Sequence, residues 1–321
     1  MKRITVVTPC FNEEANIRPL YEAIRDVFAA LPNYTYDQIY IDNCSRDRSR
    51  LILRELAAED PRVKVIFNTR NFGHIRSPFH GLLQSDGDAT ILMASDFQDP
   101  PELIPQFLRK WEDGFKVVLG VKETSSESRV MFWIRSVYYR LINRLAGDVA
   151  LVKNATGFGL YDQAVVRTLR TIEDPYPYTR GLVADLGYES AKIPFHQPRR
   201  QRGITKNNFY TLYDMAMLGI TNHSKVPLRL ATMLGFAMSA VSFLLAVGYL
   251  IAKLIWWKHF PMGVAPILIG LLFFSSIQLF FIGLLGEYIG AIFTQVQKRP
   301  LVIEQERLNF DSSTQMAEAV K

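Results

Sequence analysis

Residues 3–14, RITVVTPCFNEE, decide the expected fold, because a short run rich in β-branched residues ends in a polar cluster. Similar apolar runs recur along the first half of the chain and alternate with stretches of helical apolar spacing. Strands that alternate with helices predict an α/β fold with a mostly parallel sheet. The expected strands are Ile4–Thr8, Gln38–Ile41, Val63–Phe67, Thr90–Ala94 and Val117–Gly120, and the expected helices are Ala15–Leu31, Ser49–Glu59 and Glu102–Trp111.

Polar clusters follow three of the expected strands. They are Pro9–Glu14 after the first strand, Asp42–Ser45 after the second and Ser95–Asp99 after the fourth. Because the carboxyl ends of parallel strands share one edge of a sheet, we expect these loops to converge into a site. There is no Gly-x-Gly-x-x-Gly after the first strand and no Walker sequence. Acidic residues with a divalent cation are therefore the expected means of neutralising a bound phosphate.

Two long uncharged runs lie in the last third of the chain, at Leu230–Ala252 and Phe260–Gly286. Both exceed the roughly 20 residues that a spanning helix needs. They predict a two-helix transmembrane domain over residues 226–290. We therefore expect a soluble-type catalytic domain, residues 1–200, carried on a membrane anchor, and a purely soluble protein is excluded.

The segment 201–225, between these two domains, is expected to lie at the membrane surface. The net charge is +6, and basic residues collect around this segment, at Arg199, Arg200, Arg202, Lys206, Lys225 and Arg229. Their position favours a lipid headgroup surface as partner and argues against nucleic acid. Apolar residues recur at helical spacing over 207–224, which predicts an amphipathic helix in the headgroup plane. A helix packed on the soluble core is the alternative.

Basic residues also predict the orientation of the chain. The tail, residues 291–321, opens with Lys298 and Arg299, and the connection between the two runs holds Lys253 and Lys258. By the positive-inside comparison, we expect both termini on the cytoplasmic side.

Five motifs together resemble one enzyme family. They are Val7–Glu14, Asp42–Ser45, Arg70–His74, Asp96–Glu102 and Arg180–Gly187. Their order, their spacing and the following pair of spans resemble family 2 glycosyltransferases of the polyprenyl-phosphate type, whose members include bactoprenol glucosyltransferases and dolichyl-phosphate mannose synthases. The resemblance covers roughly residues 3–300. It implies a GT-A fold and the inverting transfer of one sugar from a nucleotide sugar to a polyprenyl phosphate.

The resemblance assigns catalysis and metal binding to Asp96 and Gln98, which would hold Mg²⁺ or Mn²⁺. Such a cation stabilises the charge that develops on a departing nucleoside diphosphate. This chain departs from the family's Asp-x-Asp-x-Gln pattern, because Ala94 occupies the position of the first acid. The diphosphate, water or Asp99 would then complete the site. For Asp99, capping of the helix that enters through Pro100 is the favoured alternative.

The resemblance also implies a donor pocket. Asp42 would accept hydrogen bonds from the base or ribose of the donor, and Pro9, Phe11 and Glu13 would form the rest of the pocket. The family often has a second acid after Asp42, where this chain has Asn43. A simple turn at Asn43 is compatible with the same arrangement.

Arg129, Arg202 and Lys206 are the candidates for holding the acceptor phosphate, because they precede or flank the interfacial segment. Many relatives carry an acid, often proposed as the base, at the position of Gly157. A phosphate monoester has a second pKa near ~6, so it is already nucleophilic at neutral pH. What the enzyme must supply is alignment and charge neutralisation.

The expected function is a hexosyltransferase that uses UDP-glucose and undecaprenyl phosphate at the cytoplasmic face of the bacterial inner membrane. Two spans are too few for a conduit, so we expect a separate flippase. The glycines of the second span are compatible with a homo-oligomer. The alternatives are a transferase that acts on another lipid acceptor and a non-catalytic membrane scaffold that retains the fold.

Overall fold

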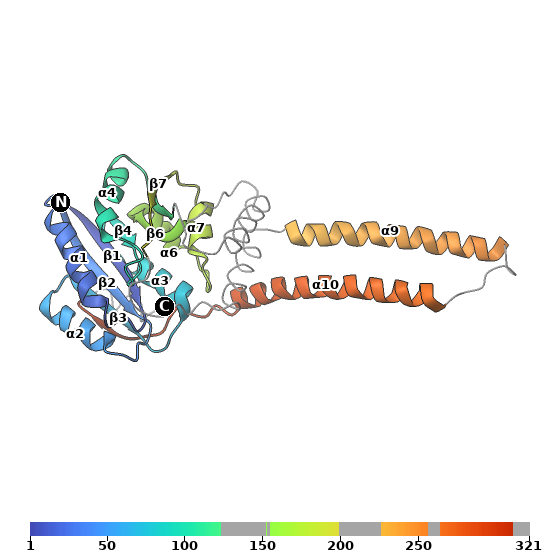
Figure 1. The fold of residues 1–321 in the computed structure, drawn as a ribbon, viewed down its shortest axis with the longest axis horizontal. Helices are drawn as coiled ribbons and strands as arrows, with labels where there is room; N and C mark the ends of the chain where they lie inside the picture. The colour runs from blue at the N-terminus through green and yellow to red at the C-terminus, as the bar shows by residue number, and fades with distance from the viewer. Residues whose placement is uncertain (123–151, 153–154, 199–225, 256–263, 311–321) are drawn as a thin grey trace.

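The computed structural model describes residues 1–122, 152, 155–198, 226–255 and 264–310. Figure 1 shows an α/β domain from which two long helices extend side by side. The candidate acceptor-phosphate residues Arg129, Arg202 and Lys206 lie outside the described residues, as does the expected amphipathic segment over 207–224.

In the described part of the chain, eight strands form one mixed sheet in the order β7-β5-β6-β4-β1-β2-β3-β8. Strands β6 and β8 run antiparallel to the other six. The strands are β1 (Lys2–Cys10), β2 (Tyr34–Asp42), β3 (Val63–Asn68), β4 (Ala89–Leu92), β5 (Val117–Lys122), β6 (Ala155–Asp162), β7 (Ser190–Phe195) and β8 (Glu304–Leu308). The prediction of an α/β fold with a mostly parallel sheet is confirmed.

Helices cover both faces of this sheet. On one face lie α1 (Ile17–Ala29), α2 (Ser49–Glu59) and α4 (Ile104–Glu112), the last preceded by the 3₁₀ turn η1 (Pro101–Leu103). The other face holds α3 (Gly73–Leu83), α6 (Gln163–Arg170) and α7 (Thr179–Asp185). Ile4 and Val6 of β1 pack on the first side and Val7 on the second, all fully buried. Burial on both faces explains the apolar runs within the central strands, such as Val6–Val7 of β1 and Ile39–Ile41 of β2.

The five expected strands all exist; four of them extend beyond their expected ends, and one stops short of its expected end. The fourth was expected to reach Ala94, but β4 stops at Leu92. The chain leaves the sheet because the Ala94 N–H donates to the side chain of Asp99, at 2.8 Å, instead of a neighbouring strand. Sequence reasoning did not identify α3, α6, α7, β6, β7 or β8.

The two projecting helices are α9 (Val226–Ile255) and α10 (Val264–Val296). Each contains a segment long and apolar enough to cross a membrane, namely Leu228–Leu245 and Phe273–Val296. Large apolar side chains on them are exposed, such as Phe236 at 73%, whereas apolar side chains of the sheet core are buried. The expected pair of apolar helices is therefore present.

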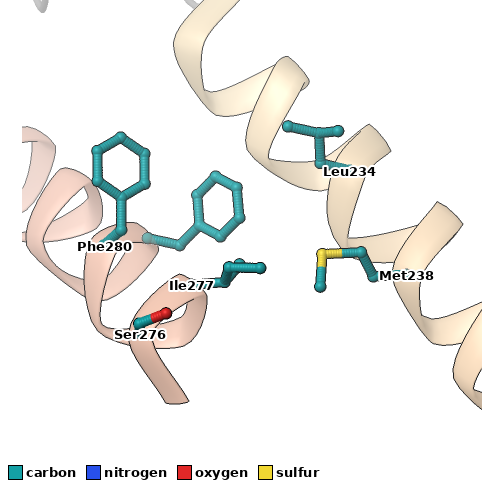
Figure 2. Close-up of a pocket in the computed structure, with 6 residues that line it drawn as sticks. Leu234, Met238, Ser276, Ile277 and Phe280 are labelled. Atoms are coloured by element: carbon teal, nitrogen blue, oxygen red, sulfur yellow. The ribbon is translucent and has the colours of Figure 1, made fainter. Parts of the chain in front are cut away.

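A groove of about 360 Å³ runs between α9 and α10. Figure 2 shows Leu234 and Met238 of α9 on one side and Ile277 of α10 on the other. Its described lining is almost entirely apolar and consists of Leu234, Met238, Ser276, Ile277, Phe280 and Phe281. The two helices thus leave apolar surface between them as well as outside them.

Part of the expected tail belongs to the catalytic domain. After α10, residues 297–303 lead to β8, which pairs antiparallel with β3 at the edge of the sheet. The sequence predicts a tail over residues 291–321 that is separate from the catalytic domain, whereas β8 within this range is the last strand of the catalytic sheet. The sequence of β8, EQERL, is mostly charged, as is common in strands that end a sheet.

Candidate active site

The three polar loops converge at the carboxyl edge of β1, β2 and β4. The Asn43 N–H donates to the Cys10 carbonyl at 3.0 Å, and the Met93 N–H donates to the Val7 carbonyl at 3.0 Å. Each loop also contains a non-glycine residue with left-handed backbone: Asn12 (φ 57°), Cys44 (φ 64°) and Phe97 (φ 58°). Such conformations cost about 1–3 kcal/mol each and cluster at functional sites. This edge is therefore the candidate active site.

Reciprocal hydrogen bonds join the loops after β1 and β2. The Asn12 N–H donates to Ser45 Oγ at 2.8 Å, and the Arg46 N–H donates back to Asn12 Oδ1 at 2.8 Å. The Glu13 N–H donates to Ser49 Oγ at 2.9 Å, at the start of α2. Because each loop satisfies polar groups of the other, neither can move alone without losing hydrogen bonds.

The predicted donor-binding residues of the first loop differ in exposure. Pro9 and Phe11 are half-buried and so retain surface for a ligand. Glu13 is buried, and its Oε2 accepts a hydrogen bond from Asn16 Nδ2 at 2.6 Å. Glu13 thus supports the entry to α1 from a buried position.

Asp42, the predicted donor contact on β2, is fully buried. The Ser45 N–H lies 3.3 and 3.1 Å from its two oxygens, and Arg50 Nε is 3.6 Å from Oδ2. Burial raises the pKa of Asp42, although the bonds from Ser45 and the charge of Arg50 act to lower it. Asp42 lies beneath the turn that follows it. A direct contact with a donor stays a prediction and requires that turn to move.

Asn43 fixes the loop after β3. Its Nδ2 donates to Asn71 Oδ1 at 2.9 Å and to the Gly73 carbonyl at 3.1 Å. Its Oδ1 accepts from the Phe72 N–H at 2.8 Å and from Asn68 Nδ2 at 3.3 Å. All four hydrogen bonds expected of an amide side chain are therefore made. Asn43 does more than form a turn, because it ties a third loop to the site.

The turn after β4 carries the predicted catalytic and metal-binding residues. Asp96 and Gln98 are both half-buried, and the Gln98 N–H donates to Asp96 Oδ1 at 3.2 Å. Asp99 is buried and bonds to the Ala94 N–H. The interpretation of Asp99 as a helix cap is wrong, because η1 begins after Pro100 without a side-chain cap. Asp99 instead closes the turn that presents Asp96.

Two cations approach this turn from other elements. Burial raises the pKa of Asp99 to about 7, and the charge of Asp96 acts in the same direction. Lys122, at the end of β5, and Arg180, in α7, are close enough to act in the opposite direction. The acidic turn is therefore flanked by positive charge, which suits a site for a diphosphate.

The donor set of this turn fits a divalent cation that a substrate helps to hold. The described residues contain no group of three or more His, Cys, Asp or Glu side chains placed to hold a metal ion. Asp96 and Gln98 offer one carboxylate and one amide oxygen. Mg²⁺ is commonly held by one or two carboxylates, with substrate phosphates and water completing its coordination. Asp99 is already committed to the backbone of Ala94.

Comparison with known families decides the classification. Residues 5–170 match the family described as glycosyl transferase family 2, and residues 226–292 match the one described as GtrB C-terminal hairpin. The chain belongs to glycosyltransferase family 2. It is a hexosyltransferase, and its mixed sheet with helices on both faces is the catalytic domain of a GT-A fold.

Two similar proteins match nearly the whole of this glycosyltransferase, and a solved structure matches about two thirds of it. The SfII prophage-derived bactoprenol glucosyl transferase of Shigella flexneri is 32% identical over 302 residues, which cover 94% of this chain and 97% of that protein. The uncharacterized glycosyltransferase YkcC of Bacillus subtilis is 32% identical over 310 residues, covering 96% and 95%. A crystal structure of glucosyl-3-phosphoglycerate synthase from Mycobacterium tuberculosis with Mn²⁺, UDP and phosphoglyceric acid has a TM-score of 0.48 and 16% identity, covering 68% and 76%.

Gly157 lies in β6 of this glycosyltransferase. Its φ is +95°, a conformation that favours glycine, and a Cβ built on it would meet no atom within 4 Å. The Tyr161 hydroxyl donates to its carbonyl at 3.3 Å. A side chain would therefore find room at this position, but only on a strained backbone.

Sequence reasoning missed several residues of this site. Arg180 is the first residue of the motif Arg180–Gly187, and this position is the only sequence signal that points to it. Lys122 follows an expected strand and carries no distinguishing pattern. Asn43 was considered only as part of a turn, and Arg50 was not considered. The partners of Asn43 and Arg50 are distant in sequence or lie in another loop.

Proposed function

We propose that this family 2 glycosyltransferase moves glucose from UDP-glucose to undecaprenyl phosphate, with inversion, at the cytoplasmic face of a bacterial inner membrane. The observation that carries the proposal is the similarity to a bactoprenol glucosyl transferase over 94% of the chain, hairpin included. Helices α9 and α10, with their exposed apolar surfaces, are what an enzyme with a membrane-bound acceptor needs.

The donor nucleotide is proposed to bind over the loops that follow β1 and β2. Pro9 and Phe11 have half-buried surfaces that can contact it. Asp42 and Glu13 lie behind them and hold the two loops in place. This assignment keeps the four predicted donor residues in one pocket but divides them into contact residues and supporting residues.

The diphosphate is proposed to lie over the turn after β4. Asp96 and Gln98 would hold Mg²⁺ or Mn²⁺ there, and the cation would stabilise the negative charge of the departing nucleoside diphosphate. Lys122 and Arg180 bring further positive charge to the same place. Their fixed charges would stabilise the departing diphosphate without reorganising during the reaction.

The acceptor phosphate is proposed to reach the site from the membrane side. Each methylene withdrawn from the bilayer costs about 0.8 kcal/mol, so a polyprenyl tail stays in the lipid and the active site lies near the headgroup plane. Gln295, near the end of α10, donates to Asp174 Oδ1 of the catalytic domain at 2.9 Å, which supports a catalytic domain close to the end of the hairpin. Arg129, Arg202 and Lys206 remain the candidates for binding the phosphate.

Three further assignments belong to this proposal. Both termini lie in the cytoplasm, a separate flippase moves the product across the membrane, and the hairpin supports a homo-oligomer. The charge pattern around the spans, their number and their glycines support these assignments in turn.

The proposal is tested with the purified full-length protein in detergent. Labelled nucleotide sugars are supplied with undecaprenyl phosphate or diacylglycerol, with and without EDTA, and lipid products are separated by thin-layer chromatography. We expect an acid-labile product from UDP-glucose and undecaprenyl phosphate, lost with EDTA and restored by Mg²⁺ or Mn²⁺. A product formed only on diacylglycerol would contradict the acceptor. Absence of both nucleotide binding and product would favour a non-catalytic scaffold.

A further inference from the structure

The strand that follows the membrane hairpin belongs to the same sheet as the active site. Strand β8 pairs antiparallel with β3 in the register Val65–Leu308, Ile66–Arg307 and Phe67–Glu306. The Thr69 N–H also donates to the Ile303 carbonyl at 3.0 Å. The chain therefore returns from α10 to cover an edge that β3 would otherwise expose.

Side chains of β8 also bind helix α2. Gln305 Oε1 accepts from Arg50 Nη2 at 2.7 Å. The Glu306 carboxylate accepts hydrogen bonds from both terminal nitrogens of Arg54, at 2.6 and 2.5 Å. Just beyond the strand, Asn309 Nδ2 donates to the Ala57 carbonyl at 2.7 Å. These contacts attach the C-terminal strand to the helix that follows the β2 loop.

Arg50 connects this strand with the donor pocket. Its guanidinium bonds to Gln305, lies 4.8 Å from the centre of the Phe67 ring and places Nε 3.6 Å from Asp42 Oδ2. One planar group is thus held from three sides, with the buried carboxylate as one of them. Asp42 in turn binds the Ser45 N–H, and Ser45 Oγ accepts the Asn12 N–H at 2.8 Å. A continuous set of contacts therefore runs from β8 to both donor loops.

We propose that Arg50 is a positioning residue for the donor pocket and that Gln305 holds it in place, so that nucleotide binding depends on the strand that follows the membrane hairpin. The inference rests on the proposed donor pocket at the loops after β1 and β2. Arg50 acts by fixing Asp42 and the turn over it. A chain that folds and inserts normally but lacks the Gln305 contact binds the donor less well.

The neighbouring pair Arg54 and Glu306 provides a matched control. It joins the same helix to the same strand, and the Arg54 guanidinium lies 4.6 Å from the centre of the same Phe67 ring. In the structure Arg54 is paired with Glu306, and it forms no described contact with Asp42. Loss of this pair therefore removes a comparable link between α2 and β8 without removing the charge beside Asp42.

The test uses full-length protein in detergent with Arg50→Ala, Arg50→Lys, Gln305→Ala, Arg54→Ala and Glu306→Ala. UDP binding is measured by calorimetry, and initial rates are measured against UDP-glucose and against undecaprenyl phosphate. We expect Arg50→Ala and Gln305→Ala each to weaken UDP binding about tenfold, because each variant removes at least one charge-assisted contact. We expect the KM for UDP-glucose to rise by a similar factor. The kcat and the KM for the acceptor stay within about twofold of wild type.

The remaining variants decide whether the role is one of positioning. Arg50→Lys keeps the charge but loses the planar fork, so donor affinity should lie between those of Arg50→Ala and wild type. Arg54→Ala and Glu306→Ala should bind UDP as wild type does. Because Gln305 is exposed, Gln305→Ala tests the inference even if Arg50→Ala does not fold.

Three results would overturn the inference. Wild-type affinity for UDP in both Arg50→Ala and Gln305→Ala would overturn this inference and leave the proposed function standing. An equal loss of affinity in Arg54→Ala and Glu306→Ala would show that β8 only supports the fold. Wild-type protein that binds no UDP would overturn the proposed function as well, which separates the two failures.

Discussion

The turns after β2 and β4 lie at the same edge of the sheet, on either side of β1, yet their acidic residues differ in burial and bonding. Asp42 is fully buried, bonded to the turn above it and paired with Arg50. Asp96 is half-buried on a turn that Asp99 closes from within. The first acid is therefore enclosed by its own turn, whereas the second keeps exposed surface. A carboxylate at the end of a strand is not by itself a catalytic group, and its burial separates the two roles.

The largest effect on activity is expected in the turn after β4, where Asp96 is partly exposed. Asp96→Asn should lower the rate of sugar transfer by at least about 100-fold, because a neutral amide cannot offset the charge of a cation on the diphosphate. Thermal unfolding should change little, since Asp96 is half-buried. Initial rates and unfolding curves of the full-length variant test this, and wild-type turnover would contradict the metal assignment. Asp113→Asn, which changes an exposed acid paired with Lys110, is the control and should keep full activity.

A smaller effect, on the free energy of unfolding, is expected in the turn after β2, where the acid is buried. Asn43→Ala should reduce the free energy of unfolding by about 2–3 kcal/mol, because it removes four hydrogen bonds and leaves buried partners unsatisfied. Urea unfolding of the full-length protein in detergent, followed by tryptophan fluorescence, measures the loss. The exposed Asn33→Ala should cost less than about 0.5 kcal/mol. Equal costs for the two variants would refute the supporting role of Asn43.

Backbone strain without a steric clash should cost less again. Gly157→Ala should reduce the free energy of unfolding by about 1–2 kcal/mol, because φ is +95° although the added methyl group meets no atom within 4 Å. Gly114→Ala provides the comparison, since its φ is +103° and its methyl group also meets no atom within 4 Å. The same urea unfolding should give similar losses for both. A stabilised Gly157→Ala would show that this backbone is not held in the left-handed region.

The smallest effect concerns pH and the docking of β8. Burial alone would raise the pKa of Glu304, but its bonds with His80 and Arg307 outweigh burial and hold the pKa below its ordinary 4.5. The ionised form is therefore favoured by folding. Its stabilisation is present above the unfolded pKa and is lost as the pH falls through the folded pKa.

Glu304→Gln should accordingly reduce stability by about 1 kcal/mol at neutral pH, because it removes the charge that His80 and Arg307 bind. The difference between variant and wild type should shrink as the pH falls below the folded pKa. Urea midpoints of both proteins over a pH series measure it. A difference that stays constant with pH would mean that the charge of Glu304 does not support β8.

The sequence predicted β1 to β5, five of the six described parallel strands, because these strands are largely buried. Strand β7 was missed, and its burial alternates along the strand. Short apolar runs such as Val65–Phe67 leave few other interpretations. Strand β6 was missed because Gly157 and Gly159 interrupt its run. Strand β8 was missed because it is mostly charged and its partner strand lies more than 200 residues earlier. No local pattern indicates a pairing whose stability comes from tertiary contacts.

The site was predictable to a similar extent. The sequence identified the loops that converge, and the resemblance singled out Asp96 and Gln98. The burial of Asp42, the bond from Asp99 to Ala94 and the contact of Arg50 with Gln305 depend on how the loops fold over one another. A motif gives the type and order of its side chains. Whether each carboxylate keeps surface for a ligand is decided by its neighbours in three dimensions.

The most direct test of this division is the increment in UDP affinity that a divalent cation produces. Calorimetry on full-length wild type, Asp96→Asn and Asp42→Asn is performed in Mn²⁺ and again in EDTA. We expect Mn²⁺ to strengthen UDP binding by wild type about tenfold or more and to have little effect on UDP binding by Asp96→Asn. In Asp42→Asn we expect a lower UDP affinity in both conditions but the same Mn²⁺-dependent gain in affinity as in wild type. An equal affinity with and without Mn²⁺ in wild type, or an increment lost in Asp42→Asn and kept in Asp96→Asn, would contradict the account.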